Sequence, residues 1–451
     1  MKILSYSLQT ISKTENLRMG LSFAKESHAL FLKKYSKNCP LRLSEICIIE
    51  KGKVITEEDS SDGIIPVVAG GKTLAYYHNK YNREKDVITI SASGAYSGFV
   101  NYWNTPIWAS DCVTVRSKDE NAYITLFIYH LLRIIQQDIY LLQKGADQPH
   151  VYPTDIKRIF IPEIDIGTQH VVLDKIQLIE REIQELQSSI QNMQIIINKT
   201  FEKEFLFNSS IFEELKCKRV FWINGIKSIN NPDLRFSAKF HRNASGFVMK
   251  QLTDITDKKI KNYLAEPIVL GASISPGDYS EDGEYQYISM ATIKNWIFDS
   301  ESANYVSKEY SDSKVAKTVR KNDIILARSG EGTIGKVALI DDDNVNGVFA
   351  DFTMRIRLKD YNPEFAYYYF RTSYFQYLIE IYKKGLGNNT NIFPIVVQEF
   401  PLIDISLDEQ QRIVDEIHAE IAKQEEIKSK IAELRNQIDS IIEEAIAKGD
   451  E

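Results

Sequence analysis

The chain contains 451 residues, of which 43% are hydrophobic and 26% charged, and its formal net charge is −7. This composition is typical of globular proteins, excludes collagen-like and low-complexity chains, and leaves room for about two to four domains. No apolar run approaches the roughly 20 residues of a membrane-spanning helix, and the N-terminus lacks the apolar stretch of a signal peptide. We therefore expect a cytoplasmic protein without a membrane span.

The charges are unevenly distributed along the chain. Residues 1–39 carry seven Lys and Arg against two Glu, and residues 211–248 carry seven basic against three acidic side chains. Residues 406–451, by contrast, carry six basic and 13 acidic side chains. A nucleic-acid site needs only one basic face, so the negative total does not exclude DNA as a partner.

An internal repeat covers nearly the whole chain. The stretch "ITISASGAYSGFV" (88–100) aligns with "IILARSGEGTIGKV" (324–337). Five further pairs of segments align in the same order, namely 15–24 with 232–241, 43–46 with 252–255, 108–116 with 349–357, 143–164 with 383–403, and 168–176 with 409–417. A duplication of this extent predicts two similar modules, each followed by a long helix.

Each module is predicted to combine strands with buried helices. The β-branched, apolar runs at 86–94 and 322–330 end in small turn residues, which is typical of strands that enter tight loops. The continuous apolar stretches 124–143 and 363–384 each predict a buried helix or a helix pair. The glycines expected at the C-cap positions after these helices are Gly145 and Gly385.

The two stretches that follow the modules show heptad periodicity. Apolar residues recur there at alternating spacings of four and three, the pattern of a coiled-coil seam. The seam residues are Val172, Ile176, Ile179, Ile183, Leu186, Ile190, Met193 and Ile197 in the first stretch and Ile427, Ile431, Leu434, Ile438, Ile441 and Ala445 in the second. Two matched helices can bury each other's apolar stripes, so we predict that these helices, each about 60 Å long, pack together.

These patterns predict an α+β protein with a pseudo-twofold internal repeat, in which two similar mixed α/β domains are separated by two long helices. The predicted parts are a basic N-terminal lead (1–39), a first domain (40–166), a central helix (167–210), a second domain with its own basic lead (211–406) and a C-terminal helix (407–451).

The ordered motifs resemble those of the specificity (S) subunit of Type I restriction–modification systems. The resemblance rests on the duplication, on "GADQPHVYPTDIKRIFIPEID" before the first heptad helix, and on "FPIVVQEFPLIDISLDEQQRIVDEI" in the second copy. The strings "IPVVAGGKTLAYYHN", "ITISASGAYSGFVNYW" and "ASDCVTV" are similar to a target-recognition domain of that family. The resemblance covers about residues 40–448, and the lead 1–39 is longer than the family pattern.

The resemblance implies a DNA-recognition subunit that does no chemistry itself. Each module would be a target-recognition domain that reads one half of a bipartite, asymmetric site, and the helices would form an antiparallel coiled coil that sets the half-site spacing and docks the partners. Those partners would be double-stranded DNA, two modification (methyltransferase) subunits and restriction–translocation subunits. No cofactor would bind this chain, because S-adenosylmethionine would bind the partner methyltransferase.

DNA contacts are predicted in the polar loops that follow the aligned strands and helices. Arg and Lys suit guanine, Asn and Gln suit adenine, and Ser and Thr serve several bases, while contacts to phosphates fix the position of the protein. The candidate residues are Lys72, His78, Asn79, Ser91, Ser93, Tyr96, Lys144, Gln148 and His150 in the first module, and Arg328, Ser329, Thr333, Lys336, Lys383, Lys384, Asn388, Asn389, Thr390 and Asn391 in the second. Because these loops differ between the modules, the two half-sites should differ in sequence.

Two alternatives remain, a self-sufficient DNA-modifying enzyme and a coiled-coil scaffold that does not bind DNA. The sequence lacks the Asn/Asp-Pro-Pro-aromatic motif of an amino-methyltransferase, and "GEGTIGKV" (330–337) is not a nucleotide-binding P-loop because Val337 stands where a Ser or Thr must bind magnesium. Four cysteines without CxxC spacing predict buried, reduced thiols, and no HExxH motif occurs. We therefore predict neither catalytic residues nor a metal site.

Overall fold

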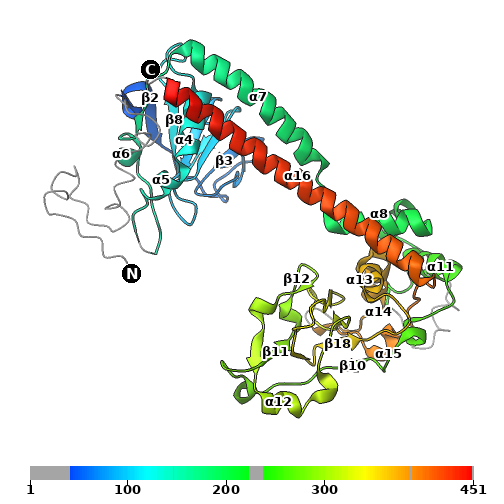
Figure 1. Ribbon diagram of the computed structural model, residues 1–451. Coiled ribbons are helices and arrows are strands. Elements are labelled where there is room, and N and C mark those ends of the chain that lie inside the picture. Colours follow the sequence, from blue (N-terminus) through cyan, green and yellow to red (C-terminus); the bar gives the residue numbers. More distant parts are fainter. Residues whose placement is uncertain (1–40, 146, 223–236, 386–388, 449–451) are drawn as a thin grey trace. The chain divides into compact units, whose positions relative to one another are not determined.

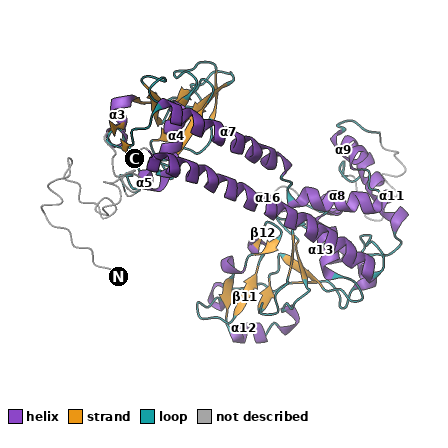
Figure 2. Cartoon of the chain, turned by 45° about the horizontal axis from the view of Figure 1, so that its top comes forward, coloured by secondary structure: helices purple, strands orange, loops and turns teal. Residues whose placement is uncertain are grey.

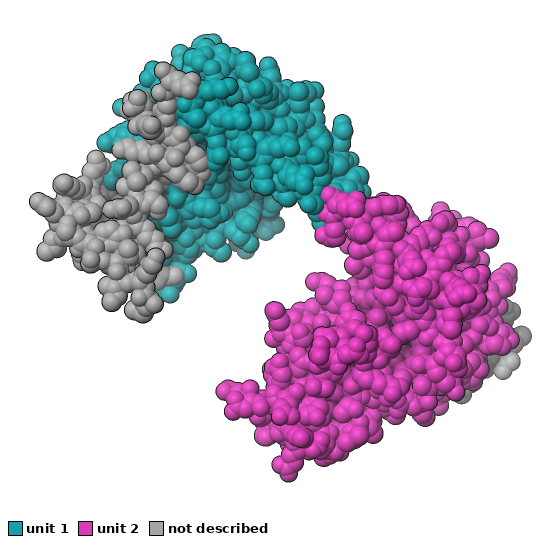
Figure 3. Space-filling view, in the orientation of Figure 1, with its two compact units in different colours: residues 1–189, 427–451 teal, residues 190–426 magenta. Residues whose placement is uncertain are grey.

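The computed structural model describes residues 41–145, 147–222, 237–385 and 389–448 (Figure 1). Strands and helices are mixed throughout this part of the chain (Figure 2). The chain divides into two compact units, unit 1 with residues 1–189 and 427–451 and unit 2 with residues 190–426 (Figure 3). The predicted basic lead 1–39, most of the aligned pair 15–24 and 232–241, and Asn388 lie outside the described residues.

Unit 1 is built around a four-stranded antiparallel sheet of order β2-β8-β5-β6 and a three-stranded sheet of order β4-β3-β7. Its elements are β1 (Leu41–Arg42), α3 (Leu43–Ile46), β2 (Cys47–Lys51), β3 (Ile65–Val68), β4 (Tyr76–His78), β5 (Val87–Ser91), β6 (Val100–Trp103), β7 (Trp108–Ala109), β8 (Cys112–Ser117), α4 (Thr125–Ile134), α5 (Gln136–Tyr140), α6 (Pro153–Ile156), β9 (Phe160–Ile161) and α7 (Ile166–Ser189). The last helix of the chain, α16 (Leu407–Lys448), contributes its residues from 427 onward.

The central strand β5 of unit 1 is buried at all five positions because both faces of its sheet are covered. On one face, Ile88 and Ile90 belong to a core that includes Phe127 and Leu131 of α4. On the other face, Val87 packs in a cluster with residues of the smaller sheet. This explains why the strand reads as a continuous apolar run rather than an alternating one.

Unit 2 repeats this arrangement. Its elements are α8 (Met193–Phe205), α9 (Ser209–Cys217), α11 (Asn243–Ile255), β10 (Val269–Leu270), β11 (Tyr285–Ile288), β12 (Ile293–Lys294), β13 (Ile297–Phe298), β14 (Asn304–Val306), α12 (Lys308–Asp312), β15 (Ile324–Ala327), β16 (Val337–Leu339), β17 (Gly347–Phe349), β18 (Thr353–Ile356), α13 (Pro363–Arg371), α14 (Ser373–Tyr382), α15 (Pro394–Val397) and residues 407–426 of α16, with short 3-10 turns between several of them.

The strand orders of the two units correspond one to one. The sheet β10-β18-β15-β16 matches β2-β8-β5-β6, and β14-β11-β17 matches β4-β3-β7. In each smaller sheet one pair is parallel, β3 with β7 and β11 with β17, although the other pair is antiparallel. The predicted internal repeat is thus confirmed, and unit 2 adds the β12–β13 hairpin to the shared framework.

A buried glutamine closes each unit at an aligned position. Gln169 donates from Nε2 to the carbonyls of Ala122 (3.0 Å) and Ile164 (2.8 Å). In unit 2, Gln410 donates to the Ile405 carbonyl (2.8 Å) and accepts the Asn362 N–H (2.8 Å). Each glutamine satisfies backbone groups that burial would otherwise leave unpaired, so the repeat extends to individual hydrogen bonds.

The apolar stretches before the loops are helix pairs, as predicted. The first forms α4 and α5, and the second forms α13 and α14. The predicted C-cap role of Gly145 and Gly385 is wrong, because the helices end at Tyr140 and Tyr382 and their C-caps are Leu141 and Lys383. The two glycines instead lie beyond the caps at φ +103° and +106°, where each turns the chain into the following loop.

In unit 1, α7 and the C-terminal part of α16 pack along their predicted seams as far as Ile438. Beyond it, Ile442 and Ile446 are buried together with the predicted Ala445, and the predicted Ile441 is half-buried. The contacts form a cluster of Ile179, Ile183 and Leu186 with Ile427, Ile431, Leu434 and Ile438, and a second group in which Val172 and Ile176 join Ile442, Ala445 and Ile446 in the core. Residue numbers rise along one helix as they fall along its neighbour, so the pair is antiparallel (Figure 1).

The predicted continuous helix over 167–210 is wrong, because α7 ends at Ser189 and α8 begins at Met193. Asn192 caps the new helix by accepting the Gln194 N–H (2.8 Å). The buried Gln424 of α16 accepts the Gln191 N–H (2.8 Å) that the break leaves without a helical partner. The heptad spacing continues across the break, but two of its predicted seam residues, Ile190 and Met193, are exposed there.

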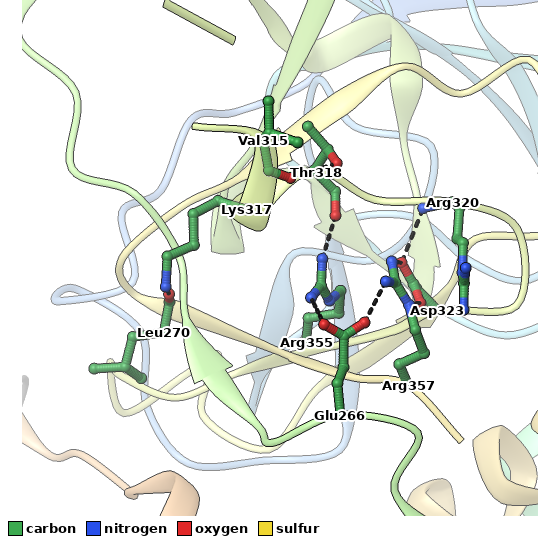
Figure 4. Close-up of polar contacts among 9 residues, drawn as sticks. All are labelled: Glu266, Leu270, Val315, Lys317, Thr318, Arg320, Asp323, Arg355 and Arg357. Atoms are coloured by element: carbon green, nitrogen blue, oxygen red, sulfur yellow. Dashed lines mark hydrogen bonds and ion pairs between the residues drawn. The ribbon is translucent and has the colours of Figure 1, made fainter. Parts of the chain in front are cut away.

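A buried ion network holds the central sheet of unit 2 together (Figure 4). Asp323, which is fully buried, accepts two hydrogen bonds from Arg357, both of 2.6 Å. Arg355 of β18 and Arg357, two residues further along the chain, share Glu266, with a distance of 2.9 Å between Arg355 Nη2 and Glu266 Oε2. Arg355 also donates to the Thr318 carbonyl. Every charge of this network therefore has an opposite charge in contact.

Replacing Asp323 with Ala should destabilise the protein strongly. The change leaves Arg357 with Glu266 as its remaining acidic partner in a mostly buried site, and breaking such a pair costs about 3–5 kcal/mol. The control is Asp343→Ala, which removes an exposed partner of Lys321 and should cost less than about 1 kcal/mol. Urea unfolding measures both free energies, and equal losses would contradict the network's structural role.

Candidate nucleic-acid interface

The predicted polar loops gather in one cluster in each unit. Loop cluster 1 comprises segments 69–75, 92–99 and 143–152 without the undescribed residue 146. Loop cluster 2 comprises segments 328–336 and 383–393 without the undescribed residues 386–388. Both clusters lie where the central strand of the four-stranded sheet ends and its hairpin turn begins.

The turns of the two clusters each begin and end at a glycine in the left-handed conformation. Their glycines pair up in φ, namely Gly94 (+81°) with Gly330 (+83°) and Gly98 (+92°) with Gly335 (+86°). Gln136 of α5 donates to the Gly98 carbonyl, and Gln376 of α14 donates to the Gly335 carbonyl, both at 2.8 Å. The "GEGTIGKV" turn therefore joins two antiparallel strands, which is not the strand-to-helix connection of a P-loop.

Lys72 and Tyr96 form the exposed part of loop cluster 1. The Lys72 ammonium lies over the rings of Tyr96 (4.7 Å) and Phe99 (5.7 Å). The buried Ser91, at the end of β5, connects this strand to segment 69–75, because its hydroxyl donates to the Gly71 carbonyl (2.9 Å). Ser91 thus supports the loops, whereas the side chains of Lys72 and Tyr96 are exposed.

A second group of predicted residues in loop cluster 1 consists of Ser93, Lys144 and His150. Lys144 and His150 exchange two backbone hydrogen bonds of 2.8 Å, and His150 also forms a bridge with Ser93. The Ser93 hydroxyl donates to the carboxylate of Asp111. The Lys144 ammonium contacts Asp155 (2.7 Å), so its charge is already neutralised within the protein.

His78 and Asn79 do not join the predicted site. They lie at the end of β4 that is remote from segment 69–75, since His78 pairs with Ile65 at the far end of the hairpin. His78 is buried and its Nδ1 accepts the Ser61 N–H (3.1 Å). The prediction grouped these residues with Lys72 because they follow it closely in sequence, but strand β4 separates them.

Arg328 and Asn391 are the centre of loop cluster 2. Arg328 donates from Nη1 to Asn391 Oδ1 (3.1 Å) and from Nε to the Asp351 carbonyl (2.8 Å). Its guanidinium lies over the ring of Phe352, at 5.8 Å. Asn391 also bridges to Ser329, as His150 bridges to Ser93 in loop cluster 1.

Four other candidates of unit 2 support the loop rather than point outward. Ser329 and Thr390 are buried, and the Ser329 hydroxyl donates to the Thr390 carbonyl (3.3 Å). The Thr333 hydroxyl donates to the Ser329 carbonyl (2.7 Å). The Lys383 ammonium contacts Glu380 (2.6 Å), and its side chain is 11% exposed. We infer that these residues shape the loop.

Lys336, Lys384 and Asn389 are more accessible candidates. Lys336 is half-buried at the end of the β15–β16 turn, and Lys384 and Asn389 are exposed. The backbone of Lys384 exchanges two hydrogen bonds with Asn391, of 2.8 and 2.7 Å. The backbone of Lys384 is therefore held against Asn391, the residue that accepts a hydrogen bond from Arg328.

Sequence reasoning named the exposed Tyr96 but missed two other exposed aromatic side chains, Tyr152 in loop cluster 1 and Phe352 beside loop cluster 2. Tyr152, which is 45% exposed, lies near-parallel to the His150 ring and takes the Lys144 ammonium over its face. Phe352 is 47% exposed beneath Arg328. Gln148, another predicted contact residue of loop cluster 1, is exposed. Exposed aromatics next to Lys or Arg were the available signal, since such rings can stack on bases.

The described residues contain no group of three or more His, Cys, Asp or Glu side chains that could hold a metal ion.

Cys47 and Cys112 are buried, and burial raises the pKa of each thiol to about 12. Both are therefore protonated at neutral pH and poor nucleophiles. Cys217 is exposed, so the prediction that the thiols are buried is wrong for this residue. Within the described part of the chain, no helix is long and apolar enough to cross a membrane.

Comparison with known families matches both units to one family. The model of the Type I restriction modification DNA specificity domain matches residues 36–193 and again residues 245–436. The two matched regions together account for more than half of the chain, and each contains one of the loop clusters. No curated protein matches the sequence.

Several solved structures resemble the chain at low identity. The S subunit of a Type I restriction-modification system from M. genitalium is 14% identical over 90% of this chain and 95% of that chain, with a TM-score of 0.44. The HsdS subunit from Thermoanaerobacter tengcongensis is 15% identical over 91% and 96%, with a TM-score of 0.40. A structure described by complex assembly and conformational transition of the type I R-M system is 15% identical over 91% and 97%, with a TM-score of 0.48.

Proposed function

The chain belongs to the family of Type I restriction-modification DNA specificity subunits, and from that premise we propose that each unit reads one half of a bipartite, asymmetric DNA target. The observation that carries the proposal is the pair of loop clusters. The two clusters follow corresponding strands and have glycines at corresponding positions of their turns, but they present different side chains. One framework with two sets of polar side chains suits two different half-sites.

The side chains of the two clusters favour different base contacts. Loop cluster 1 offers Lys72, Tyr96 and Gln148, whereas loop cluster 2 offers Arg328 and an asparagine-rich segment. Arg is suited to a bidentate contact with guanine, and Asn and Gln to adenine. The individual contacts stay predictions, and the difference between the clusters supports an asymmetric target.

We further propose that the subunit is non-catalytic and works in the cytoplasm with two methyltransferase subunits and with restriction–translocation subunits. S-adenosylmethionine would bind the methyltransferase rather than this chain. The antiparallel pair of α7 and α16 supports a role as a spacer, because its buried apolar seam makes a stiff element. The same helices expose long polar faces on which the partner subunits can dock.

A methylation assay separates this proposal from the two alternatives. Purified protein is incubated with DNA and radiolabelled methyl donor, alone and together with its methyltransferase subunit. We expect methylation only in the presence of the methyltransferase, and footprinting of the complex should then show two protected half-sites. Methylation by the chain alone would identify a self-sufficient enzyme, and a complex without any sequence-selective protection would identify a scaffold.

Replacing Lys72 with Ala should weaken DNA binding by the assembled complex about equally for all sequences. A lysine that neutralises one phosphate releases about one counterion, so its loss should reduce the slope of log K against log salt by about 0.9. The matched control is Lys175→Ala, which removes an exposed lysine of α7 away from the loops. Titrations at several salt concentrations measure both slopes. A reduced slope in the control with an unchanged slope for Lys72→Ala would refute the placement of loop cluster 1.

A further inference from the structure

Unit 2 contains a cavity of about 940 Å³, and the first residues of three helices line it. Its lining includes the first residues of α8, α13 and α16, namely Met193, Pro363 and Leu407. Each helix N-terminus carries the positive end of the helix dipole, and the side chains of Asn192, Asn362 and Ser406 cap some of the first N–H groups. Three such ends around one cavity create a site that favours a negative charge.

The cavity also contains a buried arginine without an acidic partner. Arg371 is 3% exposed and lines the cavity. Its guanidinium donates to the Tyr367 hydroxyl (2.7 Å) and contacts the Met193 sulfur (3.2 Å), and it lies over the Trp296 ring at 5.5 Å. Its Nε has no hydrogen-bond partner among the described residues.

A comparison within the same unit shows how unusual this environment is. Arg355 is buried to a similar degree, but it contacts the carboxylate of Glu266 at 2.9 Å. Arg371 has only neutral groups in contact within the described part of the chain. Burying a charge without a counter-charge is costly, so a ligand that supplies a carboxylate would relieve the cost at Arg371 and not at Arg355.

The backbone beside Arg371 is held in a rare conformation. Asn295 and Trp296, the turn of the β12–β13 hairpin, have φ values of +50° and +70°. The Trp296 carbonyl accepts the Tyr367 hydroxyl (2.7 Å), which fixes the hairpin against α13. Positive φ at both central residues is the usual geometry of a two-residue hairpin turn and suits Asn295, whereas it is uncommon for a bulky residue such as Trp296.

No contact joins the acidic residues of the cavity wall, Glu364 and Asp341, to Arg371 in the described part of the chain. Glu364 contacts His418 Nε2 at 2.6 Å, and Asp341 is exposed. Lys321, on the same wall, contacts Asp343 at 2.8 Å. Glu364 therefore has a hydrogen-bond partner and Lys321 an acidic one, whereas no acidic group contacts Arg371 within the described residues.

Three apolar side chains of the lining are exposed among polar residues such as Asn295, Asn322 and Gln411, and burying them favours a protein segment over a small ion. Ile297 is 59% exposed, Leu407 53% and Met193 39%. Exposed apolar side chains around a buried Arg and Tyr are typical of the central contacts of protein interfaces. The occupant that fits therefore carries a carboxylate between apolar side chains.

We propose that this cavity receives an acidic segment of one methyltransferase subunit, whose Asp, Glu or C-terminal carboxylate pairs with Arg371. The proposal rests on the proposed function, since that function supplies the partner. Unit 1 does not repeat the arrangement, because Arg133, in the last turn of α4, is exposed and lies over Phe99 at 5.9 Å. The contact is therefore specific to the methyltransferase copy that docks on unit 2.

The test uses the full chain with its methyltransferase subunit and three variants. Arg371→Gln removes the charge, Ile297→Asp places a negative charge on the rim, and Val315→Asp is a control at a residue that is 67% exposed elsewhere in unit 2. We expect native mass spectrometry to show two methyltransferase copies for the wild type and the control. Arg371→Gln and Ile297→Asp should weaken the binding of one copy by at least about tenfold, which is the loss of about 1.4 kcal/mol.

A thermal melt of the free chain distinguishes docking from a structural role. Because Arg371 lacks a counter-charge, Arg371→Gln should leave the Tm unchanged or raise it. Full binding of both copies by both variants would overturn the proposal, as would a lowered Tm for Arg371→Gln with normal binding by Ile297→Asp. Stabilisation by sodium acetate or inorganic phosphate without any effect on methyltransferase binding would identify a small-anion site instead. Failure of the wild-type complex to protect DNA selectively would count against the proposed function, not against this contact.

Discussion

Exchange of residues 40–165 for the corresponding module of another Type I specificity subunit should change one half of the DNA target and leave the other half unchanged. All of loop cluster 1 lies within this stretch. Strand β1 pairs with β9, with Leu41 opposite Ile161, so the two ends of the module lie side by side and a transplanted module can close on itself. Methylation of the original target should fall by a factor of about 10³ or more, the usual ratio of specific to non-specific binding.

Methylation-sensitive sequencing of a host that carries the chimera measures this result. The matched control is a chimera in which the corresponding module of unit 2 is exchanged, and this should change the opposite half of the target. A chimera of unit 1 that alters both halves, or neither, would show that the units do not read DNA independently.

Insertion of one heptad into both long helices should lengthen the spacer between unchanged half-sites. The insertions belong after Leu186 in α7 and next to Ile427 in α16, because these residues pack in the same cluster. Seven residues add about 10 Å to a helix and keep the seam in phase. This length corresponds to about three base pairs at roughly 3.4 Å each, so the recognised spacer should grow by up to that amount.

Two controls accompany the heptad insertion. The same seven residues placed in the exposed turn at Glu281–Asp282 should leave the spacer unchanged. Insertion into α7 alone shifts its seam relative to α16 and should reduce assembly. A changed half-site sequence with an unchanged distance between the half-sites would contradict the proposal that the helices set this distance.

The repeat and the local elements could be predicted from the sequence because they depend on short-range patterns. β-branched runs at 86–94 and 322–330 form the central strands, and the heptad residues from Val172 to Leu186 pack against α16. The aligned glutamine pair Gln169 and Gln410 has the same function in each unit. In these places periodicity, burial and hydrogen bonding favour the same structure.

The features that sequence analysis missed depend on contacts between distant residues. The heptad spacing continues through Ile190, but the helix breaks there because Asn192 and Gln424 satisfy the freed backbone groups. His78 looked like a loop residue, but its ring packs edge-on against Trp108. The environment of Arg371 comes from α8, α13 and the β12–β13 hairpin, which are far apart along the chain.

Mapping of methylated bases in the host genome, with and without this gene, tests the central claim most directly. Two similar units with different loop clusters predict one motif made of two different short sequences at a constant distance, separated by bases of any identity. This motif should lose its methylation when the gene is deleted. A single uninterrupted motif, or a methylation pattern that does not depend on the gene, would contradict the account.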